Sequence, residues 1–121
     1  MQLSELLTKV NDSVENLDFV TTRKYLEENL EILSQHKNLL NRNARSLLDF
    51  LVDQKKSGVE PLSRKELIII NSINAYANKF DLTGIRIILK ENPKIFLRKD
   101  SQSYLNTDAK TILTSMRVIE N

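Results

Sequence analysis

Two arginines are the side chains of this chain best placed to bind an anion. Arg23 and Arg86 each lie four residues after one apolar position and three before another, as Arg23 does between Phe19 and Leu26. This spacing puts a guanidinium on the apolar side of a helix, where an unpaired charge is costly. Such an arginine has a structural role if it binds a helix C-terminus or pairs with a carboxylate such as Asp49. Alternatively, it lines a groove that receives a partner's carboxylate or phosphate. Its occurrence in both halves of the chain favours the structural role.

Two asparagines accompany the arginines. Asn29 and Asn92 each follow a glutamate in an amphipathic segment. We expect each to end or kink its helix, because asparagine bonds readily to its own backbone. Both are also candidates to line the same groove as Arg23 and Arg86.

A basic string begins inside the second half. Lys90 and Lys94 are followed by Arg98 and Lys99, with Phe96 between them. We expect this string to form a helix end that is exposed to solvent. The alternative is that its charges contact the phosphates of a nucleic acid. The basic string is not accompanied by a series of aromatic side chains, on which the bases of a single strand would stack.

The residue types needed for catalysis or metal binding are scarce. Cysteine is absent, and His36 is the single histidine, in a polar segment with no carboxylate at ligand spacing. We find no nucleophile–base set, glycine-rich phosphate loop or clustered carboxylates. We therefore expect no catalytic, cofactor-binding or metal-binding residue, no cofactor, and a protein that is not an enzyme.

The elements that position these residues follow from an internal repeat. Six residues recur 63 positions later, and a second block recurs 65 positions later. The first set is Asp18, Arg23, Leu26, Glu28, Asn29 and Ile32, repeated as Asp81, Arg86, Leu89, Glu91, Asn92 and Ile95. In the second block Leu40, Asn41, Ala44 and Leu48 return as Leu105, Asn106, Ala109 and Leu113. A self-similar sequence indicates a repeated structural unit.

Capping residues mark where some helices begin. We expect Asp18 and Asp81 to cap the helices that follow them, and Ser63 to form a capping box with Glu66 three residues later. The isoleucine run after Glu66 could by itself form a strand, but its register with the first helical segment favours a helix.

The spacing of apolar residues predicts helices throughout. Six segments follow the i, i+3, i+4, i+7 pattern of a helical face, at about 3–17, 19–33, 41–57, 64–77, 82–92 and 106–116. Two glycines and two prolines in 121 residues are too few for an all-β fold. We predict one all-α domain, an internal duplication of a three-helix unit, as a helical repeat or a compact bundle. The repeats are 1–57 and 63–121, joined by a linker at 58–62. The isoleucine-rich segment 64–77 is apolar nearly all round, so we expect it to pack between the repeats.

Composition and charge limit the function further. The net charge is +2, with −1 on residues 1–57 (8 basic, 9 acidic) and +3 on 58–121 (10 basic, 7 acidic). Neither half has the basicity of a dedicated nucleic-acid binder. The longest apolar stretch is Leu67–Ile70, too short to cross a bilayer, and the N-terminus does not resemble a secretory signal. We expect a cytoplasmic protein, and its richness in Lys, Asn and Ile suggests a bacterial or phage genome.

One segment resembles a known repeat family. The segment that begins at residue 17 resembles the second half of a tetratricopeptide-type helical hairpin, through Leu17, Asp18, Phe19, Arg23, Leu26 and Leu30. The resemblance covers about 30 residues in each copy, and the unit here has three helices rather than two. It implies stacked helices with an extended groove for a protein partner.

The sequence thus predicts a small cytosolic helical-repeat module that mediates protein–protein interaction. The candidate partner-binding residues are Arg23, Asn29, Arg86, Asn92, Lys90 and Lys94. The alternative is a nucleic-acid-associated regulator that uses the basic second half. A homodimer through an exposed apolar face is a third hypothesis, and no membrane partner is expected.

Overall fold

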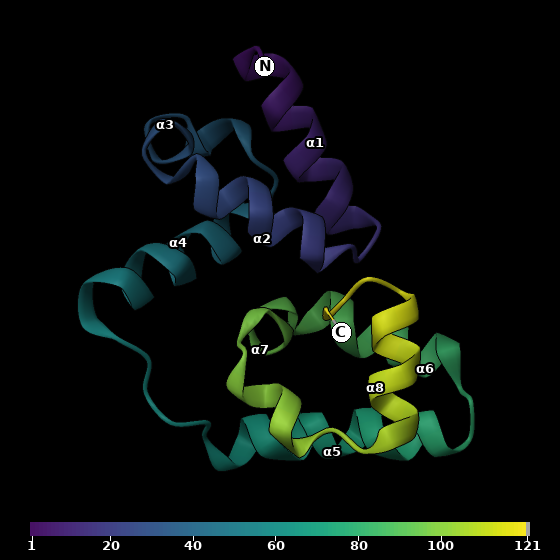
Figure 1. Ribbon diagram of the computed structural model, residues 1–121. Coiled ribbons are helices and arrows are strands. Elements are labelled where there is room, and N and C mark those ends of the chain that lie inside the picture. Colours follow the sequence, from purple (N-terminus) through teal and green to yellow (C-terminus); the bar gives the residue numbers. More distant parts are fainter. Residues whose placement is uncertain (121) are drawn as a thin grey trace.

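The computed structural model describes residues 1–120, in which every regular element is a helix (Figure 1). The first half of the chain contains α1 (Leu3–Glu15), α2 (Phe19–Glu28), α3 (Leu30–Gln35), the 3-10 turn η1 (Lys37–Leu39) and α4 (Arg42–Ser57). The second half contains α5 (Arg64–Asn78), α6 (Leu82–Glu91), α7 (Pro93–Leu97), the 3-10 turn η2 (Asp100–Tyr104) and α8 (Thr107–Ser115). The all-α prediction is confirmed for this part of the chain.

Side-chain caps that the sequence predicts begin several of the helices. Asp18 and Asp81 accept the backbone N–H groups three residues ahead, at 3.1 and 2.9 Å, and so begin α2 and α6. At the start of α5, Ser63 and Glu66 form a reciprocal capping box. These caps satisfy N–H groups that have no partner within the helix. The capping box also settles that the isoleucine run forms a helix and not a strand.

The chain breaks into more helices than the six predicted. The segment expected as one helix over 19–33 is divided at Asn29, whose φ of −134° leaves the helical region. Its side-chain amide donates to the carbonyl of Tyr25 at 2.9 Å, which ends α2. Asn92 does the same at the end of α6, with φ −136° and a 3.0 Å bond to Ile88. Pro93 then begins α7, since the first helical position needs no N–H donor.

Three helices end in a left-handed residue that is not glycine. Leu17, Phe80 and Arg117 have φ values of 60°, 55° and 63° after α1, α5 and α8. In each case the next N–H bonds back to the carbonyl five residues earlier, as Asp18 does to Ser13 at 2.9 Å. This is the Schellman termination, which turns the chain sharply into the next segment.

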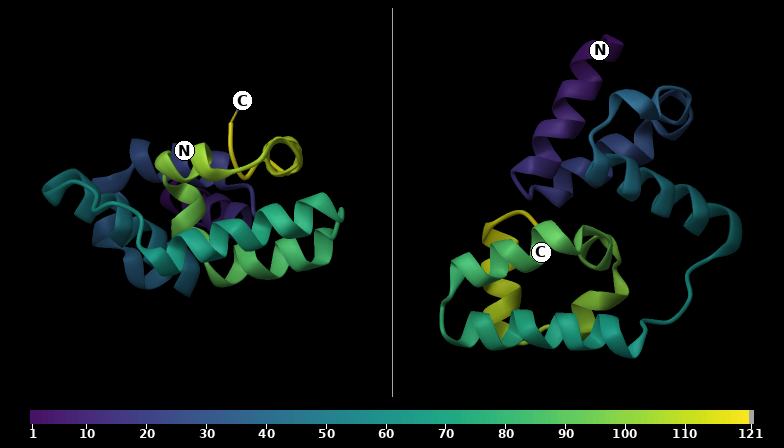
Figure 2. Two further views of the ribbon diagram at one scale, coloured as in Figure 1. Left: turned by 90° about the horizontal axis from the view of Figure 1, so that it is seen from below. Right: turned by 180° about the vertical axis from the view of Figure 1, so that it is seen from behind.

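The two halves meet through α7, which packs on α4 and α2. Buried apolar residues from both halves form one continuous core, including Leu26 and Leu48 from the first and Ile73 and Leu89 from the second. The C-terminal segment also returns to the first half, where the carbonyl of Arg117 accepts the N–H of Val20 at 3.1 Å. Two further views show this joint from below and from behind (Figure 2).

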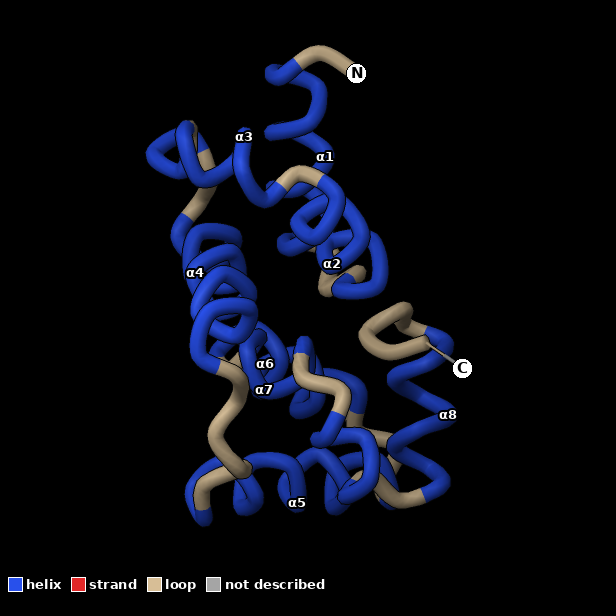
Figure 3. The backbone as a smooth tube through the Cα atoms, turned by 60° about the vertical axis from the view of Figure 1, so that its left-hand side comes forward, coloured by secondary structure: helices blue, strands red, loops and turns tan. Residues whose placement is uncertain are grey.

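Helix α5 lies at one end of the molecule, and α1 and α3 lie at the other (Figure 3). It packs on α6, α8 and η2, all of the second half. The expectation that this segment packs between the two halves is therefore wrong. Ile70, Ile73 and Ala77 form its buried face, whereas Ile68 and Tyr76 point to solvent. No helix within residues 1–120 is long and apolar enough to cross a membrane.

Candidate binding groove between the two halves

A groove runs along the line where the two halves meet. It consists of two adjoining hollows of about 420 and 600 Å³, which share Arg42, Asn43, Lys90 and Pro93 in their walls. The larger hollow is bounded by the start of α4, the start of α5 and the corner between α6 and α7. We call the two hollows together the inter-half groove. Its larger part is lined by Arg42, Asn43, Ser46, Lys65, Glu66, Ile69, Lys90, Glu91, Asn92, Pro93, Lys94 and Ile95.

Three of the six predicted site residues come together here. Lys90 lies in the last turn of α6, Lys94 is the second residue of α7, and Asn92 forms the corner between them. The cap made by Asn92 therefore sets the direction of α7 relative to α6. Across the groove, the Asn43 amide donates to the carbonyl of Lys90 at 3.4 Å. Both halves thus hold this corner in place.

The groove carries an excess of free cations. Arg42, Lys65, Lys90 and Lys94 are exposed, and within residues 1–120 none of their side chains forms an ion pair or hydrogen bond. Of the acidic groups in the larger hollow, Glu66 accepts the N–H of Ser63 at 2.9 Å and lies 3.7 Å from the Arg98 guanidinium. Glu91 is the other acidic residue in the wall of the larger hollow. The field in the groove therefore favours a negatively charged ligand.

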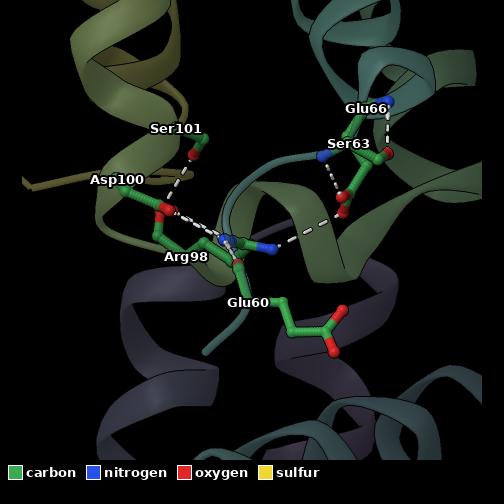
Figure 4. Close-up of polar contacts among 6 residues, drawn as sticks. All are labelled: Glu60, Ser63, Glu66, Arg98, Asp100 and Ser101. Carbon is green, nitrogen blue, oxygen red and sulfur yellow. Dashed lines mark hydrogen bonds and ion pairs between the residues drawn. The ribbon is translucent and has the colours of Figure 1, made fainter. Parts of the chain in front are cut away.

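Arg98 is a buried arginine that joins several segments next to Glu66 in the wall of the groove (Figure 4). Its side chain is 7% exposed and bonds to both carboxylate oxygens of Asp100, with Nε–Oδ1 at 2.9 Å and Nη2–Oδ2 at 2.7 Å. The same guanidinium donates to the carbonyl of Glu60 at 2.6 Å and approaches Glu66. Arg98 therefore ties the end of α7 to the linker and to the start of α5, which fixes two walls of the groove.

The Arg98 network shifts the pKa values of two of its members, in the directions that favour their charged forms. The hydrogen bonds from Arg98 lower the pKa of the Asp100 carboxyl below its ordinary value, against an opposing effect of desolvation. The same bonds raise the pKa of Arg98. The expectation that Arg98 belongs with Lys94 and Lys99 to a solvated basic string is therefore wrong, because the Arg98 side chain is buried and paired with Asp100. The acidic residue two positions later is the sequence signal that could have indicated this pairing.

Arg23 and Asn29 lie outside the groove. The Arg23 Nη1 donates to the carbonyl of Leu97, the last residue of α7, and its Nε bonds to Glu27 at 2.6 Å. Asp49, considered as a partner for Arg23, pairs instead with Lys37 at 3.5 Å. The side chain of Asn29 is engaged with Tyr25. Arg23 thus holds α2 against the end of α7.

Arg86 does not share the surroundings of Arg23. It is exposed on α6, lies outside the walls of the groove, and forms no side-chain hydrogen bond or ion pair within residues 1–120. The two arginines therefore occupy similar helix positions with different contacts.

A second surface lies outside the six candidate site residues, although an exposed apolar face was one of the hypotheses from the sequence. Four large apolar side chains on the outer side of α5 and α6 are exposed, at 57% for Ile68, 36% for Tyr76, 71% for Phe80 and 53% for Ile87. The Tyr76 ring covers Gly84, where a Cβ would lie 2.8 Å from two ring carbons. Ile87 follows one turn after Gly84. We call these four residues the apolar stripe. Ile68, Tyr76 and Phe80 are separated by eight and four residues, a helical spacing that is the sequence signal for one face of α5 and its turn.

No known protein family, curated protein or solved structure matches this chain. Within residues 1–120 no group of three or more His, Asp or Glu side chains is placed to hold a metal ion. The residues that line the inter-half groove present charged, polar and apolar side chains.

Proposed function

We propose that this chain is a small protein-interaction module that binds an acidic segment of another protein in the inter-half groove. The observation that carries the proposal is the set of four unpaired cations, Arg42, Lys65, Lys90 and Lys94, converging on one concave surface. Unpaired cations in a groove attract a carboxylate-bearing segment and orient it as it approaches.

The apolar part of the wall supports a protein ligand. Ile69, Pro93 and Ile95 lie among the cations of the larger hollow. A peptide segment or helix that alternates acidic and apolar side chains satisfies both kinds of contact. The fixed corner at Asn92 and the Arg98 network favour binding as well, since a rigid groove loses little entropy when it is filled.

Nucleic acid is the second candidate ligand. Residues 63–99 carry 8 basic and 3 acidic side chains, a net charge of +5, which would attract phosphates. The cations of the groove are interspersed with isoleucine and proline, however. Phe19, an aromatic residue in the wall of the smaller hollow, is only 2% exposed and offers almost no ring surface on which a base could stack. We therefore place this candidate behind a protein partner.

We further propose that the two halves are copies of one helical unit that have diverged in charge. The caps at Asp18 and Asp81, the helix ends at Asn29 and Asn92, and the left-handed residues Leu17 and Phe80 support this, each pair being 63 residues apart. At two of the positions related in this way, acidic residues of the first half, Glu27 and Glu31, correspond to Lys90 and Lys94 of the groove. A cationic groove on one side only is the expected result of such divergence.

The proposal is tested by affinity capture from cells that express the chain. The bait proteins are the unmodified chain, the groove variant Lys90→Glu/Lys94→Glu, and a control variant Lys9→Glu/Lys110→Glu with the same change in net charge at exposed sites on α1 and α8. We expect a protein that is captured by the unmodified and control baits, lost with the groove variant, and retained after nuclease treatment. Equal capture by all three baits, or capture that nuclease abolishes, would contradict the proposal.

A further inference from the structure

A short segment that follows α8 crosses from the second half of the molecule to the first. Residues 117–120 leave the end of α8 and run back to the middle of the molecule, where the halves meet (Figure 1). The left-handed conformation of Arg117, with φ 63°, turns the chain out of α8 in this direction. We call residues 117–120 the strap.

The strap is fastened to the start of α2 by three hydrogen bonds. The carbonyl of Arg117 accepts the N–H of Val20 at 3.1 Å. The guanidinium of Arg117 donates to the Asp18 carboxylate at 3.2 Å and to the Thr21 hydroxyl at 3.3 Å, across 99 and 96 positions of the chain. These bonds connect the two halves independently of the linker at 58–62.

Two apolar residues of the strap reinforce this attachment. Val118 and Ile119 are 3% and 5% exposed. They lie in the wall of a hollow of about 350 Å³, which we call the strap hollow. The other apolar residues of its wall come from α2 and from the end of α7, and are Phe19, Val20, Phe96 and Leu97. The strap thus reaches the joint at which α7 packs on the first half.

Helix α7 connects the strap hollow to the inter-half groove. Its first three residues line the larger hollow of the groove, whereas its last two, Phe96 and Leu97, line the strap hollow. Phe19 likewise lies in the walls of both the smaller hollow of the groove and the strap hollow. Five residues make little more than one helical turn, so a displacement of one end of α7 also moves the other end.

We propose that the strap sets the shape of the inter-half groove by holding α7 against the first half. With the strap in place, α7 is fixed between the strap, the Arg23 bond to Leu97 and the packing on α4. Release of the strap removes three hydrogen bonds and two buried side chains from this joint, which frees α7 to move relative to α4. The wall of the groove that carries Lys94 then moves with it. This inference concerns the shape of the groove and holds for any ligand that fills it.

Hydrogen exchange of the full chain, followed residue by residue by NMR, tests the proposal. Ile119→Ala weakens the strap, and Ile112→Ala is its matched control, since Ile112 is similarly buried, at 6% exposed, on α8, which packs on α5. We expect Ile119→Ala to speed exchange of the Val20 N–H and of the α7 amides by at least about tenfold, with little change in α5. Ile112→Ala should instead speed exchange in α5 and α8.

A second variant weakens the strap without altering a buried side chain. Arg117→Ala removes the bonds to Asp18 and Thr21 from a side chain that is 60% exposed. It should speed exchange at the same sites as Ile119→Ala, by a smaller factor, whereas Arg86→Ala should leave these sites unchanged.

A pair of spin labels reports on the groove itself. The chain contains no cysteine, so labels attach only at the introduced positions Ser46→Cys, on α4, and Lys94→Cys, on α7. Dipolar broadening of the spectrum measures the separation of these two walls. We expect one narrow range of separations in the otherwise unmodified chain and a broader range after Ile119→Ala or Arg117→Ala is added.

Two results would overturn the proposal. One is exchange that rises equally in α5 and α7 in both strap variants, which would make the strap an ordinary part of one cooperative core. The other is faster exchange of the Val20 N–H with unchanged α7 amides and unchanged label spectra, which would mean that α7 keeps its place without the strap. If Ile119→Ala fails to fold, Arg117→Ala decides between these results. The groove cations are unaltered in the exchange variants, so neither result bears on the binding of a protein in the groove.

Discussion

The side-chain oxygen of Asn74 accepts the backbone N–H of Asn106 at 2.9 Å, and so joins the middle of α5 to the start of α8. The amide of Asn74 donates to the carbonyl of Tyr104, also at 2.9 Å. In the first half, Asn11 accepts the N–H of Asn41 at 2.9 Å in the same way. These asparagines replace backbone partners at the point where a 3-10 turn leads into the next helix.

Replacement of Asn74 should therefore destabilise the fold. Asn74→Ala leaves the N–H of Asn106 and the carbonyl of Tyr104 without partners, and we expect a loss of about 1–3 kcal/mol in the free energy of unfolding. Urea unfolding followed by circular dichroism measures it. Asn71→Ala is the matched control, because Asn71 is exposed on the same helix, and its effect should stay within about 0.5 kcal/mol. Equal effects of the two substitutions would show that the Asn74 bonds contribute nothing.

Glycine at the two left-handed helix ends should have opposite effects. Leu17 and Phe80 share nearly the same φ, but Leu17 is 4% exposed and Phe80 is 71% exposed. Relief of the left-handed strain is worth about 1–2 kcal/mol, so Phe80→Gly should stabilise the chain by about 1 kcal/mol. Leu17→Gly gains the same relief but loses a buried leucine side chain, worth about 1.5–3 kcal/mol plus the cost of the cavity. Thermal and urea unfolding in dilute solution should separate the two variants, and a destabilised Phe80→Gly would refute the strain argument.

Arg23 and Arg86 should differ in their importance for folding. Arg23→Ala removes the bond to the end of α7 and leaves the carbonyl of Leu97 unpaired, so we expect a loss of about 1–2 kcal/mol. Arg86→Ala removes an exposed side chain without a polar partner in the described part of the chain, and should change stability by no more than about 0.5 kcal/mol. Urea unfolding of the two variants makes the comparison. The reverse order would mean that the contact between α2 and α7 is not what holds the halves together.

The Arg98–Asp100 pair should make stability depend on pH in the acidic range. The pKa of Asp100 is lowered in the folded state, so its ionised form stabilises the fold at pH values above its ordinary pKa of 3.8. This contribution is lost as the pH falls through the lower folded value. The unmodified chain should therefore exceed Asp100→Asn in stability at neutral pH, and the difference should shrink below pH 3.8. The control Asp53→Asn alters an exposed carboxylate on α4 that forms no side-chain hydrogen bond or ion pair within residues 1–120, so it should change stability at neutral pH by no more than about 0.5 kcal/mol.

Local chemistry explains which parts of the fold could be predicted from the sequence. The caps at Asp18 and Asp81 and the capping box at Ser63 depend on residues within three positions, and all are confirmed. Asn29 was expected to end or kink its helix. The sequence does not indicate a separate α3, because the apolar residues of α3 continue the pattern of α2. The short helix α7 was not predicted, because Pro93 indicates only the end of the preceding helix in the sequence, whereas it also begins the next one.

The parts of the candidate site that could not be predicted from the sequence depend on contacts between residues far apart in the chain. Arg98 bonds to a carbonyl 38 positions earlier, and Arg23 bonds to a carbonyl 74 positions later. Neither partner is a side chain, so no pattern of residue types reveals it. The exposure of Ile68 and Tyr76 likewise depends on where α5 packs, which apolar periodicity alone does not decide. Lys90 and Lys94 were candidates because their charge can be read from the sequence, whereas the concave wall around them cannot.

The binding of a protein in the inter-half groove is tested most directly by photo-crosslinking in living cells. A photoreactive phenylalanine analogue is placed at Ser46, in the wall of the larger hollow, or at Lys110, an exposed control position on α8. We predict a discrete protein adduct from position 46 that is absent from position 110 and disappears when Lys90→Glu/Lys94→Glu is added. Absence of a protein adduct at position 46, or an adduct that nuclease digestion removes, would contradict the account.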